Sequence, residues 1–155
     1  MTTWRTFDGF TDYELSISQM EETVQMIKQA TAPEQIWLLE YNPLYTAGKS
    51  AKAADLLEKS LMPVYEAKRG GQYTYHGPGQ RIIYPMLNLK NHKMDIKHYV
   101  WLLEEWIIET LRELGVQSYR QKGLVGIWVI GNRGQDKIAA IGVRVTKWIS
   151  SYGIS

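Results

Sequence analysis

The chain has 155 residues, of which 45% are hydrophobic, and this fits one globular domain with enough apolar side chains for a core. Its 18 Lys and Arg residues and 16 Asp and Glu residues give a net charge of +2 without a dense basic run, which argues against a nucleic-acid partner. It has no cysteine and only three histidines, without the spacing of metal ligands, so neither a disulfide framework nor a metal site is expected. No leader or membrane-spanning stretch stands out, so we expect a cytoplasmic protein with no membrane partner.

The first elements that the sequence predicts are a helix and a buried strand. Apolar residues recur with helical spacing from Tyr13 to Ile27, and Thr11 or Asp12 precedes them as a candidate N-cap. The run IWLLEY, from Ile36 to Tyr41, is short, apolar and closed by an Asn-Pro pair, as is typical of a buried strand.

A loop and a group of short strands are expected next. The loop runs from Asn42 to about Ser50, and a short helix is predicted near Ala53 to Lys59. Three strands should follow, with the sequences PVYEAK, QYTY and RIIYPML. The segment HGPG between the last two predicts a hairpin or sharp reversal, because Gly77 and Gly79 can adopt positive φ.

The last half of the chain predicts one long helix and three strands. The helix begins near Asp95 and stops at Gly115. Its expected apolar stripe contains Ile96, Tyr99, Leu103, Trp106, Thr110 and Leu114. The strands are VQSYRQ, LVGIWVIG and KIAAIGVRVTKWI, the last two joined across NRGQD. The mixed order of helices and strands predicts an α+β fold in a single domain, residues 1–155.

The segment RGGQYTYHGPGQ concentrates glycines on both sides of an aromatic strand. It can be two turns around that strand, or two stretches of bare backbone that approach a ligand from the same edge. In the second interpretation Arg69 and His76 supply polar groups, although an exposed strand-end arginine and a turn-capping histidine remain the simpler alternatives. The segment contains neither of the common phosphate-binding glycine patterns.

The longer stretch RGGQYTYHGPGQRIIYPMLNL resembles the signature of the octanoyl (lipoyl) transferases of lipoate biosynthesis, relatives of the lipoate and biotin protein ligases. NPLYTAGKS and GIWV…DKIAAIGVRVTKWISSYGIS are similar to further segments of that family. The resemblance implies a mixed sheet flanked by helices and an enzyme without a cofactor. Such an enzyme takes an octanoyl group from octanoyl-acyl carrier protein onto a cysteine. It then passes the group to a lysine on the lipoyl domains of 2-oxoacid dehydrogenases or on the glycine cleavage H protein.

The resemblance also implies the site residues. The family's substrate-lining loop matches Arg69, Gly70, Gly71, Gln72, Tyr73, Thr74, Tyr75 and His76. Its lysine matches Lys137, with Ala140, Ile141 and Gly142 lining the acyl pocket. Its HGxA segment falls on Tyr152, Gly153, Ile154 and Ser155, of which the last three are expected to bind substrate. Lys137 is the expected catalytic residue, because an ammonium beside a thiol lowers the pKa of that thiol and could later activate the incoming amine.

Two departures from the family leave alternatives open. Tyr152 stands where the family has histidine, and Ser155 where it has alanine. The family's cysteine lies beyond the position of Ser155, and the chain has no other cysteine to replace it. We therefore expect a domain that is incomplete at its C-terminal end, or a shortened inactive relative that still binds an acyl chain or a lipoyl domain. An ATP-dependent lipoate or biotin protein ligase is the third alternative.

Overall fold

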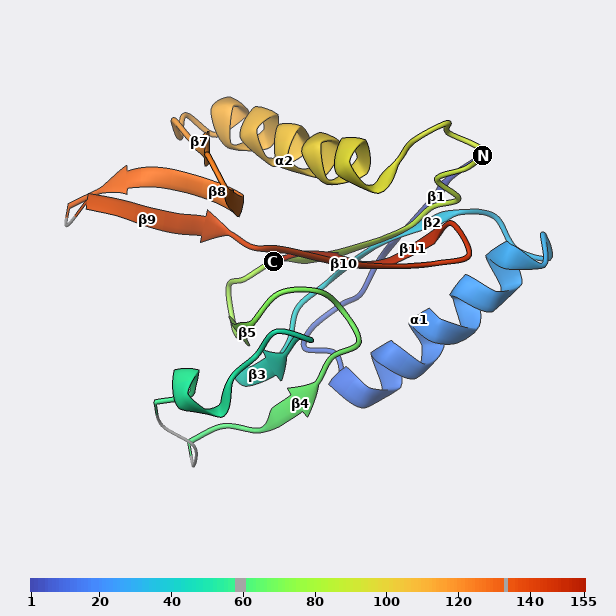
Figure 1. Ribbon diagram of the computed structural model, residues 1–155. Helices are drawn as coiled ribbons and strands as arrows, with labels where there is room; N and C mark the ends of the chain where they lie inside the picture. The colour runs from blue at the N-terminus through green and yellow to red at the C-terminus, as the bar shows by residue number, and fades with distance from the viewer. Residues whose placement is uncertain (58–60, 133) are drawn as a thin grey trace.

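The central element of the fold is a five-stranded mixed sheet in the order β1-β2-β6-β11-β10 (Figure 1). The computed structural model describes residues 1–57, 61–132 and 134–155. The strands span Thr3–Thr6 (β1), Gln35–Leu39 (β2), Ile82–Met86 (β6), Ile141–Thr146 (β10) and Ile149–Ile154 (β11). β1 runs parallel to β2, and the other neighbours are antiparallel.

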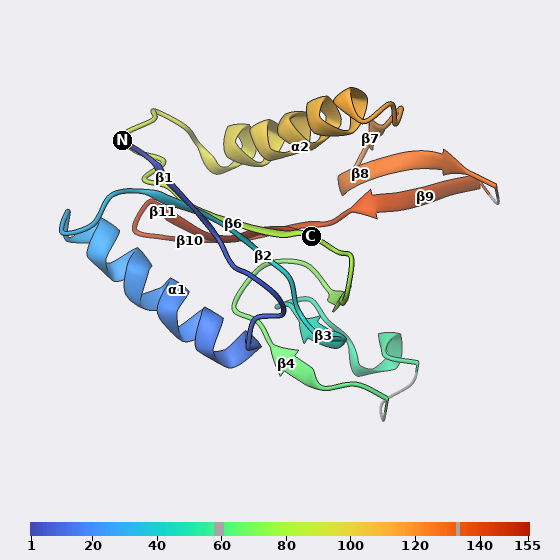
Figure 2. The same ribbon diagram turned by 180° about the vertical axis from the view of Figure 1, so that it is seen from behind.

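Two helices cover the opposite faces of this sheet, as Figures 1 and 2 show from two sides. Helix α1 (Tyr13–Lys28) begins where the Asp12 side chain accepts a hydrogen bond from the Leu15 N–H at 2.8 Å, which confirms Asp12 as the N-cap. Helix α2 (Ile96–Glu113) begins in the same way at Asp95 and ends before Gly115, whose φ is +78°. Each helix covers its own cluster of buried apolar side chains. Among the described residues, no helix is long and apolar enough to cross a membrane.

The buried face of α2 differs from the predicted stripe. Tyr99, Leu103, Glu104 and Ile107 are buried, as expected for Tyr99 and Leu103. Ile96 and Leu114, which we also expected inside, are 50% and 73% exposed. Ile96 is the first residue of the helix and Leu114 is its C-cap, so both stand at its ends. The predicted stripe is therefore wrong at both of its ends, and the helix buries one face along its middle turns.

Two smaller sheets flank the central one. The first has the order β4-β3-β5, with β3 at Leu44–Ala47, β4 at Val64–Glu66 and β5 at Tyr73–His76. Strand β3 corrects the prediction of a continuous loop from Asn42 to Ser50. Pairing with both β4 and β5 makes this segment a strand, and a local pattern does not record such long-range pairing. The helix predicted near Ala53 to Lys59 is a single 3₁₀ turn at Ala53–Asp55, and residues 58 and 59 of that prediction lie outside the described residues.

The second small sheet has the order β7-β8-β9, with β7 at Tyr119–Gln121, β8 at Leu124–Gly131 and β9 at Gly134–Ala139. The segment KIAAIGVRVTKWI, predicted as one strand, is divided between β9, β10 and the start of β11. The chain leaves β9 at Ala140 and reverses at Lys147 and Trp148, whose φ angles are +49° and +72°. The predicted NRGQD connection is shorter than expected, since Gly134 already belongs to β9; residue 133 lies outside the description.

Of the hairpin or sharp reversal predicted at HGPG, the hairpin is wrong, although a tight turn is present, in which Gln80 N–H donates to Gly77 O at 3.1 Å. Strand β5 pairs with β3, whereas β6 pairs with β2 and β11, so the two strands on either side of HGPG belong to different sheets. The segment is a crossing between layers instead. Gly79 has the expected positive φ of +82°, but Gly77 does not. The α+β architecture itself is as predicted.

Candidate functional site

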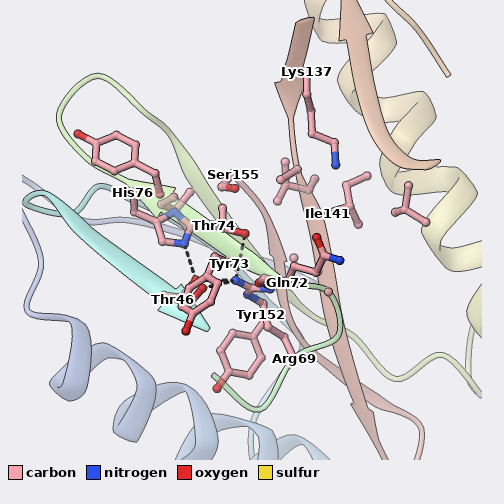
Figure 3. A pocket seen from close by; sticks show the side chains of 18 of the residues that line it. Thr46, Arg69, Gln72, Tyr73, Thr74, His76, Lys137, Ile141, Tyr152 and Ser155 are labelled. Atoms are coloured by element: carbon pink, nitrogen blue, oxygen red, sulfur yellow. Dashed lines mark hydrogen bonds between the residues drawn. The ribbon is translucent and has the colours of Figure 1, made fainter. Parts of the chain in front are cut away.

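A cavity of about 640 Å³ opens where the loop and strand around β5 face the strands β9, β10 and β11 (Figure 3). This volume lies within the usual range of small-molecule sites. Its walls come from segments far apart in sequence, namely residues 69–84, 123–142 and 152–155, together with single residues of α1 and β3 and Ser50. The fold therefore brings the middle of the chain and its last third together at one site.

The cavity contains nearly all of the residues that the sequence predicted for the site. Its lining includes Arg69, Gly71, Gln72, Tyr73, Thr74, Tyr75, His76, Lys137, Ala140, Ile141, Gly142, Gly153, Ile154 and Ser155. Gly70 is the exception: its N–H donates to Val143 O at 3.2 Å, and its carbonyl accepts from Arg69. The structure thus gathers the predicted residues, while their roles in binding and catalysis stay predictions.

Arg69 is a buried residue in the lining of the cavity. Its side chain is buried, and its guanidinium donates to Thr46 Oγ1 at 2.6 Å, Thr74 Oγ1 at 3.0 Å and Gly70 O at 2.8 Å. The alternative of an exposed strand-end arginine is therefore wrong. Within the described ranges, no carboxylate forms an ion pair with Arg69. Burial of this charge lowers the pKa of Arg69.

The glycines around Arg69 make room for its side chain. A Cβ atom on Gly142 would lie 2.9 Å from Arg69 Cδ and 3.2 Å from Gly70 O. A Cβ atom on Gly48 would collide with the carbonyl of Gly71 and lie 2.7 Å from Arg69 Nη1. Gly71 has a φ of +85°, which other residues adopt only with strain. Glycines from three separate segments thus surround the guanidinium. Gly48 and Gly142 leave space that a side chain would fill, and Gly71 allows the positive φ.

His76 lies beside this network and is neutral. Its Nδ1 is 2.8 Å from Gln80 Oε1, and its Nε2 is 3.2 Å from Thr46 Oγ1. Burial, with a smaller contribution from the Arg69 charge, lowers the pKa of His76 to about 4, although the hydrogen bond with Gln80 opposes the shift. Because Thr46 Oγ1 accepts from Arg69, its own hydroxyl is free to donate to Nε2, while Nδ1–H donates to Gln80. The histidine is therefore more than a turn cap, and it holds Gln80 against the cavity.

Lys137 enters the cavity from the other side (Figure 3). Its backbone belongs to β9, and its Nζ lies 5.3 Å from the centroid of the Trp128 ring. Although the residue as a whole is exposed, partial burial of the ammonium lowers the pKa of Lys137. We expected Lys137 and the segment 140–142 to share one strand, and this is wrong, because Ile141 begins β10 in a different sheet.

The junction between β9 and β10 is joined to the last residue of the chain. Ala140 N–H donates to Ser155 O at 2.8 Å, and Ser155 N–H donates to Ala140 O at 3.0 Å. This backbone pair extends the β10–β11 ladder beyond Ile141 and Ile154. It fixes Ser155 beside Ala140, the residue between Lys137 on β9 and the start of β10.

Several residues of the cavity were missed by the sequence reasoning. Tyr13, Thr46, Ser50, Gln80, Ile82, Tyr84, Gly123, Leu124, Val125 and Ile138 also line it. Thr46 lies in NPLYTAGKS, a stretch that the sequence had singled out without giving any of its residues a role. Leu124, Val125 and Ile138 are 49%, 51% and 43% exposed, so they form an apolar edge at the open side. Nothing in a strand pattern distinguishes such residues from ordinary outward-facing ones.

Tyr152, the residue at a departure from the family pattern, also lines the cavity. Its side chain is buried, and its hydroxyl accepts from the Lys68 N–H at 3.3 Å. Its φ of +56° is uncommon for a tyrosine. Burial raises the pKa of Tyr152, so the phenol stays protonated. Among residues that the structure describes, no group of three His, Asp or Glu side chains could hold a metal ion.

Residues 12–155 match the model of the lipoyl protein ligase A/B catalytic domain. The chain is 53% identical to an octanoyltransferase of Paramagnetospirillum magneticum, over 98% of this chain and 72% of that protein. It is 47% identical to an octanoyltransferase of Brucella melitensis, over 98% of this chain and 61% of that protein. The chain therefore spans between about three fifths and three quarters of the length of these relatives.

Solved structures of lipoate protein ligases share the fold. A putative lipoate protein ligase from Thermoplasma acidophilum superimposes with a TM-score of 0.66 at 17% identity, covering 98% of this chain and 67% of the other. Lipoate-protein ligase A bound with ATP gives a TM-score of 0.65 at 15% identity, covering 98% and 65%. At these identities the likeness concerns the fold alone, and it agrees with the mixed sheets and two helices described above.

Proposed function

The chain belongs to the lipoyl protein ligase A/B catalytic domain family, and on this premise we propose that it forms the acyl-binding part of an octanoyltransferase of lipoate biosynthesis. In this reaction a cysteine thiolate attacks the thioester of octanoyl-acyl carrier protein and releases the carrier's thiol. A lysine amine of a lipoyl domain then attacks the enzyme thioester, forms the amide and releases the enzyme's thiol. These 155 residues contain no cysteine, so the thiol must come from outside them.

The observation that carries the proposal is the composition of the cavity. Apolar side chains such as Ile141 and Ile154 line one part of it, and the ammonium of Lys137 enters from another. An octanoyl chain needs an apolar wall along its length and a polar group only at its reacting end. This cavity offers both in one continuous space.

Lys137 is the residue that we propose for the chemistry. While protonated, its ammonium favours a neighbouring thiolate over the thiol. Its pKa is lowered by burial, so it loses a proton more easily than an exposed lysine does, and it can then accept one from the incoming amine. The same group would thus serve both half-reactions, as a cation in the first and as a base in the second.

We propose that the partners are octanoyl-acyl carrier protein and the lipoyl domains of 2-oxoacid dehydrogenases and of the glycine cleavage H protein. The exposed apolar edge formed by Leu124, Val125 and Ile138 borders the cavity, where an arriving partner would make contact. The cytoplasm is the proposed location. The curated relatives are named octanoyltransferases, which favours the transferase over the ATP-dependent ligase as the function of this chain.

Methyl NMR of the isoleucines tests the proposal on the chain as it is. Titration with octanoyl-pantetheine, a thioester that mimics the carrier's arm, should shift the signals of Ile141 and Ile154. Ile17, which packs on the α1 side of the central sheet, serves as the control and should not shift. Magnesium-ATP should leave all three unchanged. Saturable shifts with ATP and none with the thioester would instead indicate a ligase, and no response to either would contradict an acyl site.

A further inference from the structure

The Lys137 side chain crosses strand β8 directly over Gly126. A Cβ atom on this glycine would lie 2.6 Å from Lys137 Cε and 3.1 Å from Lys137 Nζ. It would also lie 2.7 Å from the carbonyl oxygen of Ala139. Gly126 is buried, and its φ is +121°. A side chain at residue 126 would therefore take the space that the end of the lysine now occupies, and it would also meet the Ala139 backbone.

A β-bulge directs Lys137 toward the cavity. Ile127 pairs with Ala139 and Trp128 pairs with Lys137, so the register skips Ile138. In a regular strand, successive side chains point to opposite faces. Here the neighbours Lys137 and Ile138 both line the same cavity, because the extra residue changes the direction of the strand.

A buried carboxylate fixes Gly126 to helix α2. Glu104 is 8% exposed, and its Oε1 accepts the Gly126 N–H at 3.2 Å. Its Oε2 accepts from Arg120 Nε at 3.0 Å, and this ion pair balances the charge of the buried carboxylate. Gly126 is therefore attached to the long helix behind it and is not free to move away from the lysine.

We propose that Gly126 is a positioning residue for Lys137: its missing side chain gives the lysine its path into the acyl cavity, and Glu104 holds that path open. On one side the lysine chain rests against bare backbone, and on the other its ammonium faces the Trp128 ring. The inference rests on the proposed function only for the importance of Lys137. Its tests measure the lysine itself, so they can fail or succeed independently of any transferase activity.

The first test follows the titration of Lys137 by NMR of its ¹³Cε atom in Gly126→Ala. A methyl at this position should push the ammonium out toward water, and the titration midpoint of Lys137 should move upward, toward that of an exposed lysine. Gly134→Ala is the matched control. Gly134 lies in the same hairpin with a φ of +120°, and a Cβ atom there meets no described atom within 4 Å. It should therefore carry the same positive-φ strain, without the contacts to Lys137 and Ala139 O, and leave the Lys137 midpoint in place.

An unchanged midpoint in folded Gly126→Ala, or the same shift in both variants, would overturn the proposal. The second test is a thermodynamic cycle with Lys137→Ala. Gly126→Ala should lower the urea midpoint of unfolding less in the Lys137→Ala background than in the native chain, whereas Gly134→Ala should lower it equally in both. Equal losses for Gly126→Ala in the two backgrounds, or failure to fold in both, would assign the glycine to the backbone alone and overturn the proposal.

Discussion

Arg69 places a buried positive charge beside the cavity, and its guanidinium donates hydrogen bonds to hydroxyls and backbone carbonyls. We expect Arg69→Met to lower the free energy of unfolding by at least about 2 kcal/mol, because the buried acceptors would lose their donors. Arg81→Met, at an exposed arginine nearby in sequence, is the control and should change stability by less than about 0.5 kcal/mol. Urea unfolding at pH 7 measures both values. Equal, small effects would mean that the network contributes no stability.

His76 makes the stability of the protein depend on pH. Its pKa is about 4 in the folded chain and 6.5 when unfolded, so the unfolded chain binds the extra proton between these values. The stabilisation is complete above pH 6.5 and is lost as the pH falls toward 4. From pH 7 to pH 5, this residue alone should reduce the free energy of unfolding by about 2 kcal/mol.

His76→Gln should remove this pH-dependent part, whereas His98→Gln, on the exposed side of α2, should retain it. Free energies of unfolding at the two pH values, measured by urea for all three proteins, check this expectation. A native profile parallel to that of His76→Gln would show that the buried imidazole is not the group that responds.

At the scale of elements, the crossing between β5 and β6 depends on two glycines for different reasons. Gly79 has φ +82° in open space, so Gly79→Ala should cost about 1 kcal/mol through backbone strain. The positive φ expected at Gly77 is wrong, and a side chain there would instead meet the hydroxyl end of Tyr75, which is 44% exposed. Because the exposed Tyr75 side chain can rotate away, Gly77→Ala should lower the free energy of unfolding less than Gly79→Ala does. Thermal unfolding of the two variants gives the order, and the reverse order would contradict it.

The elements that could be predicted from sequence are those fixed by local interactions. Both helices and their aspartate caps follow from spacing and capping within a few residues. Strand β3 could not be predicted, because its pairing partners β4 and β5 lie well beyond it in the sequence. The division of 137–149 into three segments could not be predicted either, because its breaks at Ala140 and at the positive-φ residues Lys147 and Trp148 contain no glycine or proline. Most of the site residues came from the family resemblance. Thr46 and Gln80 were missed, because their hydrogen bonds to Arg69 and His76 form only when the fold buries these two side chains together.

At the scale of the whole molecule, the composition limits the chemistry. We predict that the 155-residue chain, mixed with octanoyl-acyl carrier protein, forms no octanoyl thioester, because no residue in it carries a thiol. Intact-mass spectrometry after denaturation should show the unmodified chain. Hydroxylamine treatment and peptide mapping are the control, since they separate a thioester from a stable amide on a lysine. A stoichiometric, hydroxylamine-sensitive adduct would contradict the prediction.

The place of β11 in the central sheet has a consequence for biosynthesis. β11 is formed by residues 149–154, yet it lies between β6 and β10 in the sheet. Before these residues are synthesised, β6 and β10 have no strand between them. The cluster of buried apolar side chains beneath α1 then also lacks Ile149 and Tyr152. Such nascent chains carry unpaired strand edges and uncovered apolar surface. The cavity, which residues 152–155 help to line, therefore cannot be complete before this segment has been synthesised.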